Sequence, residues 1–183
     1  MDARSDDPAP RRNIELKSKC ANLHRAKDAA LRFGAHEAGV LDQTDTYFHC
    51  TTGRLKLRET VGRAAELIAY ARADRTDARA SEYQLVPVDE PGPLKRSLAS
   101  TLGVRVVVEK RRTLLLWHNV RIHLDDVRGL GSYVEFEAVI AGGEDEATAY
   151  DRVATLAAAL QLHPHDRIAT SYSNLIEAAR GAV

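Results

Sequence analysis

Charged and apolar residues alternate one by one through several short segments of this 183-residue chain. Basic residues alternate with leucines over 54–58, charged residues with aliphatic ones over 120–125, and Glu135 and Glu137 flank Phe136. Side chains of a β-strand point alternately to its two faces, so each segment predicts a strand with one charged and one apolar face. If such strands form one sheet, one face of that sheet is charged, and the fold must either expose this face to solvent or enclose it in an interior.

The strand-like segments follow one another closely and are joined by short turns. Consecutive strands of this kind favour an antiparallel sheet, and so many neighbouring antiparallel strands favour closure into a barrel. The predicted fold class is therefore α+β, a closed antiparallel β-barrel flanked by helices. The predicted strands are 12–20, 44–50, 54–60, 66–73, 81–88, 104–110, 113–117, 120–125 and 133–140, and the predicted helices are 22–38, 93–103, 146–162 and 173–179.

Length and composition limit the classes of protein that the chain can belong to. Its length fits one domain, which we expect over residues 12–183 after a disordered leader over residues 1–11. The 26 basic residues equal the 26 acidic ones, which argues against a nucleic-acid-binding protein. No apolar run is long enough to cross a membrane, and the two separated cysteines predict no disulfide framework. We therefore expect a cytoplasmic protein with no membrane or nucleic-acid partner.

The charged strand faces allow two interpretations. In the first, they are the solvated outside of an ordinary sheet, and for any single strand this is the commoner case. In the second, the barrel is inverted, so that charged faces line its interior and apolar faces pack outward against the helices. Acidic residues concentrate in the first and last strands and basic residues in the middle ones, which favours the second interpretation. Isolated buried charges are costly, so such an interior makes sense if it binds a polyanion and divalent cations.

Five segments of the chain carry recognisable motifs: Asn-Ile-Glu-Leu-Lys (13–17), Gln-Thr-Asp-Thr-Tyr-Phe (43–48), Gly-Arg-Leu-Lys-Leu-Arg-Glu (53–59), Arg-Ile-His-Leu-Asp-Asp-Val-Arg-Gly-Leu-Gly (121–131) and Val-Glu-Phe-Glu (134–137). In the same order, these segments resemble blocks of the CYTH domain family, the triphosphate tunnel metalloenzymes. The resemblance covers about residues 12–177.

The resemblance implies an eight-stranded tunnel, a homodimer, that binds a small triphosphate such as ATP or tripolyphosphate with Mg²⁺ or Mn²⁺. It implies a metal-binding role for Glu15, Asp125, Glu135 and Glu137. It implies triphosphate contacts from Lys56, Arg58, Arg72, Arg79, Lys110, Arg112 and Arg121. Lys17 is the candidate for moving a proton, because a lysine among other cations can have a lowered pKa.

Three functions follow from the resemblance. The Asp-Thr-Tyr-Phe and His-Leu-Asp-Asp-Val blocks favour a class IV adenylate cyclase, which converts ATP into cyclic AMP and pyrophosphate. An inorganic or thiamine triphosphatase is the alternative, since the motifs recognise the triphosphate itself. Asn13 stands where the family signature has its first acidic residue and brings a metal no charge, which keeps a non-catalytic nucleotide- or polyphosphate-binding module as a third possibility.

Overall fold

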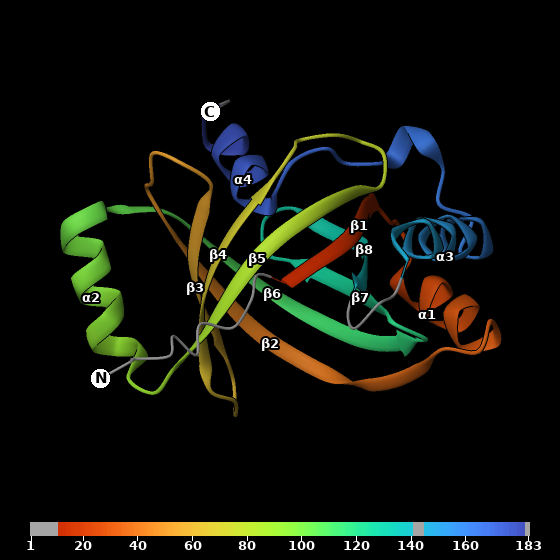
Figure 1. The fold of residues 1–183 in the computed structure, drawn as a ribbon, viewed down its shortest axis with the longest axis horizontal. Helices are drawn as coiled ribbons and strands as arrows, with labels where there is room; N and C mark the ends of the chain where they lie inside the picture. The colour runs from red at the N-terminus through yellow and green to blue at the C-terminus, as the bar shows by residue number, and fades with distance from the viewer. Residues whose placement is uncertain (1–10, 141–144, 182–183) are drawn as a thin grey trace, which may run out of the picture.

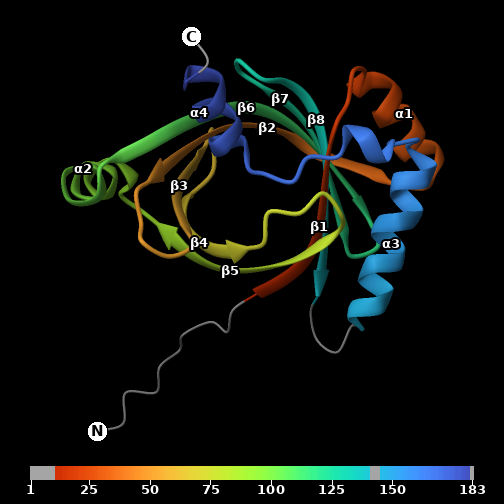
Figure 2. The ribbon, with the colours of Figure 1, turned by 90° about the horizontal axis from the view of Figure 1, so that it is seen from above.

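Eight strands form one closed antiparallel barrel in the computed structural model, which describes residues 11–140 and 145–181. The strand order is β1-β5-β4-β3-β2-β6-β7-β8, and pairing of β1 with β8 closes the barrel (Figures 1 and 2). The α+β barrel predicted from the sequence is confirmed. The strands are β1 (Arg11–Lys19), β2 (His36–Phe48), β3 (Arg54–Thr60), β4 (Ala65–Arg72), β5 (Arg79–Val88), β6 (Val104–Trp117), β7 (Val120–Val127) and β8 (Gly131–Ile140).

The helices pack on the outside and at one end of the barrel. Helices α1 (Leu23–Arg32) and α3 (Glu146–Ala159) lie together against β1, β7 and β8, while α2 (Pro91–Leu102) lies on the far side against β2 and β3 (Figure 1). A short 3₁₀ helix, Pro164–Asp166, leads toward α4 (Tyr172–Gly181), which packs on β6. None of the described helices is long and apolar enough to span a membrane.

The main hydrophobic core lies between the barrel and its covering helices. Ile14 of β1 and Phe136 of β8 are fully buried and pack with Val153 and Leu156 of α3. The residues next to them in the sequence, among them Glu15, Glu135 and Glu137, point to the opposite face of the strand and line the barrel interior. This arrangement confirms the inverted interpretation, with a polar interior and an apolar outer face.

A second apolar cluster closes one end of the interior. Tyr172 of α4 is buried with Val106 and Val108, which share the inward face of β6 with its basic residues. Leu175 and Ile176, one helical turn further along, pack against the same cluster. One end of the barrel interior is therefore apolar, and α4 packs against it.

Several predicted boundaries were wrong. The helix predicted over 22–38 begins at the correct cap, where Asn22 accepts a hydrogen bond of 2.9 Å from the Arg25 amide, but it ends at Arg32. Gly34 then takes a φ of +96°, which favours glycine, and β2 begins at His36. The strands predicted over 104–110 and 113–117 are one strand, β6, because adjacent Arg111 and Arg112 point to opposite faces without interrupting the ladder.

Strand β2 begins earlier than the predicted 44–50 because its first half also pairs with β6, across a bulge between Glu37 and Gly39. The leader predicted over residues 1–11 lies outside the described residues except for Arg11, the first residue of β1.

Candidate functional site

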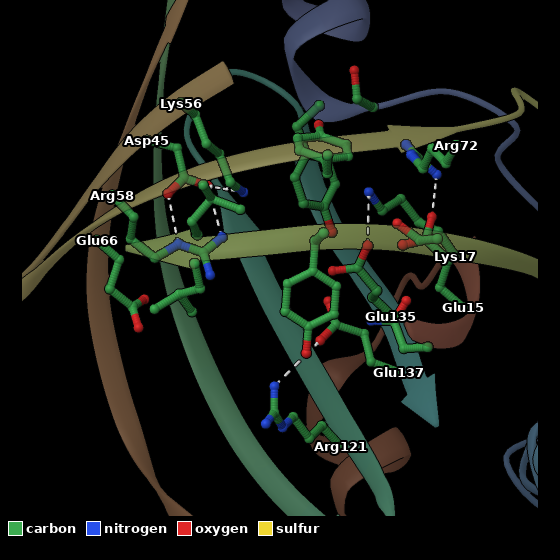
Figure 3. A pocket seen from close by; sticks show the side chains of 18 of the residues that line it. Glu15, Lys17, Asp45, Lys56, Arg58, Glu66, Arg72, Arg121, Glu135 and Glu137 are labelled. Carbon is green, nitrogen blue, oxygen red and sulfur yellow. Dashed lines mark hydrogen bonds and ion pairs between the residues drawn. The ribbon is translucent and has the colours of Figure 1, made fainter. Parts of the chain in front are cut away.

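A cavity of about 240 Å³ occupies the barrel interior and is lined by inward-facing side chains (Figure 3). The alternation of each strand delivers these side chains, because every second residue points inward. Ten of the twelve predicted site residues line the cavity: Glu15, Lys17, Lys56, Arg58, Arg72, Lys110, Arg112, Arg121, Glu135 and Glu137. Residues up to 122 positions apart in the sequence (137 − 15) are thus brought into one chamber.

The other two predicted residues, Arg79 and Asp125, are buried behind the lining. The Arg79 guanidinium lies 3.1 Å from Glu15, on the opposite strand of the β1–β5 ladder. Both Asp125 oxygens accept hydrogen bonds of 2.6 Å from Arg112, and one also accepts 2.9 Å from the Tyr172 hydroxyl. In this geometry Asp125 orients Arg112 through a two-point contact. The metal-binding role of Asp125 and the phosphate-binding role of Arg79 stay predictions.

Three basic side chains converge on one buried carboxylate, Asp45, on one side of the cavity (Figure 3). Lys56 and Lys110 approach the same oxygen of Asp45 at 3.0 and 2.7 Å. Arg58 donates to both oxygens, at 2.7 and 2.9 Å. We call these four residues the Asp45 cluster. With three cations and one anion, the cluster has surplus positive charge toward the cavity.

Burial and the charges of the Asp45 cluster together lower the pKa values of two of its members, Asp45 and Lys110. Burial by itself would raise the pKa of Asp45, but the charges of Arg58 and the two lysines hold that pKa well below its usual range. Burial lowers the pKa of Lys110 to about 7, and the attraction of Asp45 offsets this only in part because other cations lie nearby. Lys110 is therefore a buried amine that can gain or lose a proton near neutral pH.

Two carboxylates and a histidine meet across the cavity, on β7 and β8. One oxygen of Glu135 accepts from Lys17 at 3.0 Å, and the other accepts from Arg112 at 3.0 Å and lies 3.4 Å from His123 Nδ1. The same nitrogen lies 3.8 Å from Glu137. We call these five residues the Glu135 cluster. The charges of Lys17 and Arg112 outweigh the effect of burial and hold the pKa of Glu135 well below its usual range.

Lys17 is fixed from two directions. Besides its ion pair with Glu135, its ammonium lies 3.8 Å from the centre of the ring of Tyr172, the first residue of α4.

The carboxylate of Glu15 pairs with two arginines, Arg72 and Arg79. Burial and the charges of the other carboxylates raise the pKa of Glu15, although Arg72 and Lys17 oppose this.

The donor set of this side of the cavity fits a hard divalent cation. Ligand atoms of His123, Glu135 and Glu137 all lie within 4.8 Å of one another. Glu15 pairs directly with Glu137 in the β1–β8 ladder and points into the same cavity. Carboxylate oxygens are the ligands that Mg²⁺ and Mn²⁺ prefer, and an imidazole nitrogen is compatible with Mn²⁺. We therefore expect Glu15, His123, Glu135 and Glu137 to be able to hold such an ion.

Three residues of the site were not predicted from the sequence: Asp45, His123 and Tyr172. Asp45 lies within the recognised 43–48 segment, and its position at period two from Gln43 and Tyr47 could have placed it on the inward face. His123 lies between two charged inward residues of β7 and could have been found in the same way. Tyr172 begins a helix beyond the barrel, and its contact with Asp125 has no signal in the sequence.

The family model of the CYTH domain matches residues 11–172. The chain belongs to the CYTH domain family. A comparison with curated proteins finds no match. The Asp45 cluster and, apart from His123, the Glu135 cluster therefore line the interior of a CYTH tunnel.

Solved structures share this tunnel fold. PH1012 from Pyrococcus horikoshii OT3 is 22% identical, with a TM-score of 0.76 over 89% of this chain and 98% of that one. A candidate adenylate cyclase from Vibrio parahaemolyticus is 19% identical, with a TM-score of 0.71 over 90% of this chain and 97% of that one. HpAC1 from Hippeastrum, a candidate adenylyl cyclase with a dominant triphosphatase activity, is 12% identical, with a TM-score of 0.64 over 92% and 96%. At these identities the likeness concerns the fold alone.

Proposed function

We propose that this CYTH protein is a metal-dependent enzyme that acts on the triphosphate group of a small molecule. The observation that carries the proposal is the division of one cavity into two parts. The Asp45 cluster has surplus positive charge, and the Glu135 cluster holds carboxylates and an imidazole within 4.8 Å of one another. A polyphosphate with its metal ion presents the complementary charges to both.

The Asp45 cluster and the arginines around it would bind the phosphates. The guanidinium group of Arg58 and the ammonium groups of Lys56 and Lys110 are held in place before any ligand arrives, because Asp45 contacts all three. Charge-assisted hydrogen bonds from such groups to phosphate oxygens are short and strong. Arg72, Arg112 and Arg121 also line the cavity and extend the cationic surface along the tunnel.

The carboxylates of Glu15, Glu135 and Glu137, with His123, would hold the Mg²⁺ or Mn²⁺ ion. A divalent ion bound there would supply charge neutralisation on the phosphate and acidify the attacking hydroxyl group. Lys17 and Arg112 keep Glu135 ionised and oriented, as their ion pairs of 3.0 Å require.

Cyclisation of ATP is the leading reaction. In it the ribose 3′-hydroxyl attacks the α-phosphorus, the bond to the β-phosphate oxygen breaks, pyrophosphate leaves, and the hydroxyl proton passes to a base. The resemblance of the 43–48 and 121–131 segments to class IV adenylate cyclases supports this choice. Lys17 stays the predicted proton carrier, and its ammonium is held by Glu135 at 3.0 Å.

Hydrolysis of the triphosphate is the second candidate. In it water attacks the terminal phosphorus, the bond from that phosphorus to the bridging oxygen breaks, the diphosphate leaves and orthophosphate forms. The same tunnel would stabilise the charge on the phosphates. HpAC1, which shares the fold, has a dominant triphosphatase activity, and this supports hydrolysis as the second candidate. A homodimer and a cytoplasmic location stay predictions.

A panel of turnover assays tests the proposal. ATP, tripolyphosphate and thiamine triphosphate are each incubated with Mg²⁺, with Mn²⁺ and without metal, and the products are separated. We expect metal-dependent formation of cyclic AMP and pyrophosphate from ATP; release of orthophosphate would instead identify the triphosphatase. Binding of these compounds without turnover would identify a non-catalytic module, and neither binding nor turnover would contradict the proposal.

A further inference from the structure

Part of the tunnel wall is uncharged, although charged residues surround it. Ile68 and Tyr70 of β4 lie directly opposite Leu85 and Tyr83 of β5 in the antiparallel ladder. All four residues line the cavity. They form a two-by-two block on one wall, which we call the β4–β5 wall.

The β4–β5 wall adjoins the region assigned to phosphate. Lys56 of the Asp45 cluster pairs with Ile68 in the β3–β4 ladder, so the basic cluster borders the wall on one side. On the other side Tyr83 pairs with Arg11 of β1, two residues from Asn13. Phosphate needs no apolar or aromatic contact, whereas a planar heterocycle gains from apolar burial and ring stacking. A ligand whose phosphates reach Lys56 would place its other end along this wall.

Two polar atoms at the wall have no partner within the described residues. The Tyr83 hydroxyl and the Asn13 side-chain oxygen are both buried and accept or donate no hydrogen bond. Asn13 is only 4% exposed, and both residues line the cavity. The other tyrosine of the wall differs, since Tyr70 is hydrogen-bonded to Tyr47. Buried polar groups are nearly always paired in native proteins, so an unpaired hydroxyl and an unpaired amide oxygen beside an apolar wall indicate a ligand with a polar edge.

We propose that the β4–β5 wall, with Asn13 and Tyr83, binds the planar nitrogen heterocycle of an organic triphosphate. The inference rests on the proposed function and adds which part of the substrate the enzyme distinguishes. The rings of Tyr83 and Tyr70 and the side chains of Ile68 and Leu85 contact the face of the heterocycle. The Asn13 oxygen accepts from an exocyclic amino group, and the Tyr83 hydroxyl bonds to a ring nitrogen. Adenine and the aminopyrimidine of thiamine both offer this chemistry, while tripolyphosphate offers none.

Calorimetric titration in the presence of Mg²⁺ tests the inference with three ligands. They are the α,β-methylene analogue of ATP, in which the bond that the proposed cyclisation breaks is blocked, thiamine triphosphate and tripolyphosphate. We expect Tyr83→Phe, which removes only the hydroxyl, and Asn13→Ala each to weaken binding of one organic ligand by about fivefold, as the loss of one hydrogen bond implies. Tripolyphosphate binding should be unchanged, and the organic ligand that is weakened identifies the heterocycle.

Tyr133→Phe is the matched control. Its hydroxyl donates to the Leu130 carbonyl at 3.4 Å and lies outside the cavity lining, so this variant should bind all three ligands like the wild type. Equal loss for tripolyphosphate and the organic ligands, or no loss for any of them, would overturn the assignment of the wall while leaving the proposed function intact. Failure of the wild type to bind any of the three would overturn the proposed function itself.

Discussion

The two sides of the tunnel use the same kinds of charged residue in opposite proportions. In the Asp45 cluster one carboxylate contacts three cations, all at 3.0 Å or less. In the Glu135 cluster two cations contact one carboxylate at 3.0 Å. Among residues 11–140 and 145–181 the second carboxylate, Glu137, has only longer contacts, at 3.8 Å to His123 and 4.0 Å to Arg121. The first cluster therefore has more positive than negative charges, and the second contains a carboxylate, Glu137, that no cation contacts closely within the described residues.

This difference shows how one buried cavity can prepare for an anion and a cation together. A dry interior with this many charges would be costly, so each cluster partly neutralises itself in the free protein. What each cluster lacks is the charge that the proposed ligand would bring.

Removal of the Asp45 carboxylate should have the largest effect. Asp45→Asn leaves three buried cations without their shared anion, and loss of one partner from a buried charge network costs about 3–5 kcal/mol. Because tripolyphosphate can supply the missing negative charge, it should restore more stability to the variant than to the wild type. Chemical denaturation with and without tripolyphosphate measures both effects.

Asp42→Asn provides the control for this experiment. Asp42 lies on the same strand, but its side chain is 53% exposed and its pairing with Arg111 is long, at 3.4 Å. Its replacement should change the free energy of unfolding by less than about 0.5 kcal/mol. If Asp45→Asn were as mild as Asp42→Asn, Asp45 would not hold the three cations of its cluster in place.

Removal of the Glu137 charge should act on metal binding. Glu137→Gln changes little in shape but takes one carboxylate from the donor set, and we expect the metal concentration for half-saturation to rise about 10–100-fold. Mn²⁺ titration followed by electron paramagnetic resonance gives this value without relying on turnover.

Phe136→Ala tests the neighbouring residue on the opposite face of β8. Phe136 is fully buried against α3, so its truncation should cost about 3–5 kcal/mol of stability and leave Mn²⁺ affinity unchanged. Equal Mn²⁺ affinity in the wild type and in Glu137→Gln would exclude Glu137 as a ligand.

The effect of pH should be smaller and should arise in the Asp45 cluster. Burial lowers the pKa of Lys110 to about 7, so above that pH the free protein holds a neutral amine facing Asp45 and the cations Lys56, Arg58 and Arg112. A bound polyanion favours the charged form, so binding above pH 7 must take up a proton. Affinity should therefore fall as pH rises, by at most about tenfold per pH unit. Titrations with tripolyphosphate from pH 6 to 9 measure the slope.

Lys110→Arg removes this source of pH dependence while keeping the positive charge, because arginine stays protonated throughout the range. Ionisation of tripolyphosphate itself affects both proteins alike. The ratio of wild-type to variant affinity should thus fall above pH 7; a constant ratio would show that Lys110 does not titrate in this range.

Alternation was enough to predict the barrel and most of its lining. Inward-facing sets such as Glu135 and Glu137 follow from a period of two once the strand is known. Element boundaries that depend on tertiary contacts were not predicted. The end of α1 depends on Gly34 and on the pairing of β2 with β6, which local pattern does not reveal.

The sequence predicted which residues line the site better than it predicted which of them contact one another. Nothing in the sequence indicates that Asp45 collects three cations from β3 and β6, or that Asp125 holds Arg112 in place of lining the cavity. These contacts depend on which strands are adjacent in the closed barrel and on side-chain lengths. The unpaired atoms of Asn13 and Tyr83 also emerge only from the three-dimensional packing.

The affinity for tripolyphosphate in the presence of Mg²⁺ tests the central claim most directly, namely that a triphosphate binds at the cations inside the tunnel. Calorimetry would compare the wild type with Lys56→Ala, Arg58→Ala and the surface variant Arg128→Ala, whose side chain is 81% exposed. The account predicts that both tunnel variants weaken binding about tenfold or more with folded structure retained, and that Arg128→Ala binds like the wild type. Equal affinity in all four proteins, or equal weakening by Arg128→Ala, would contradict it.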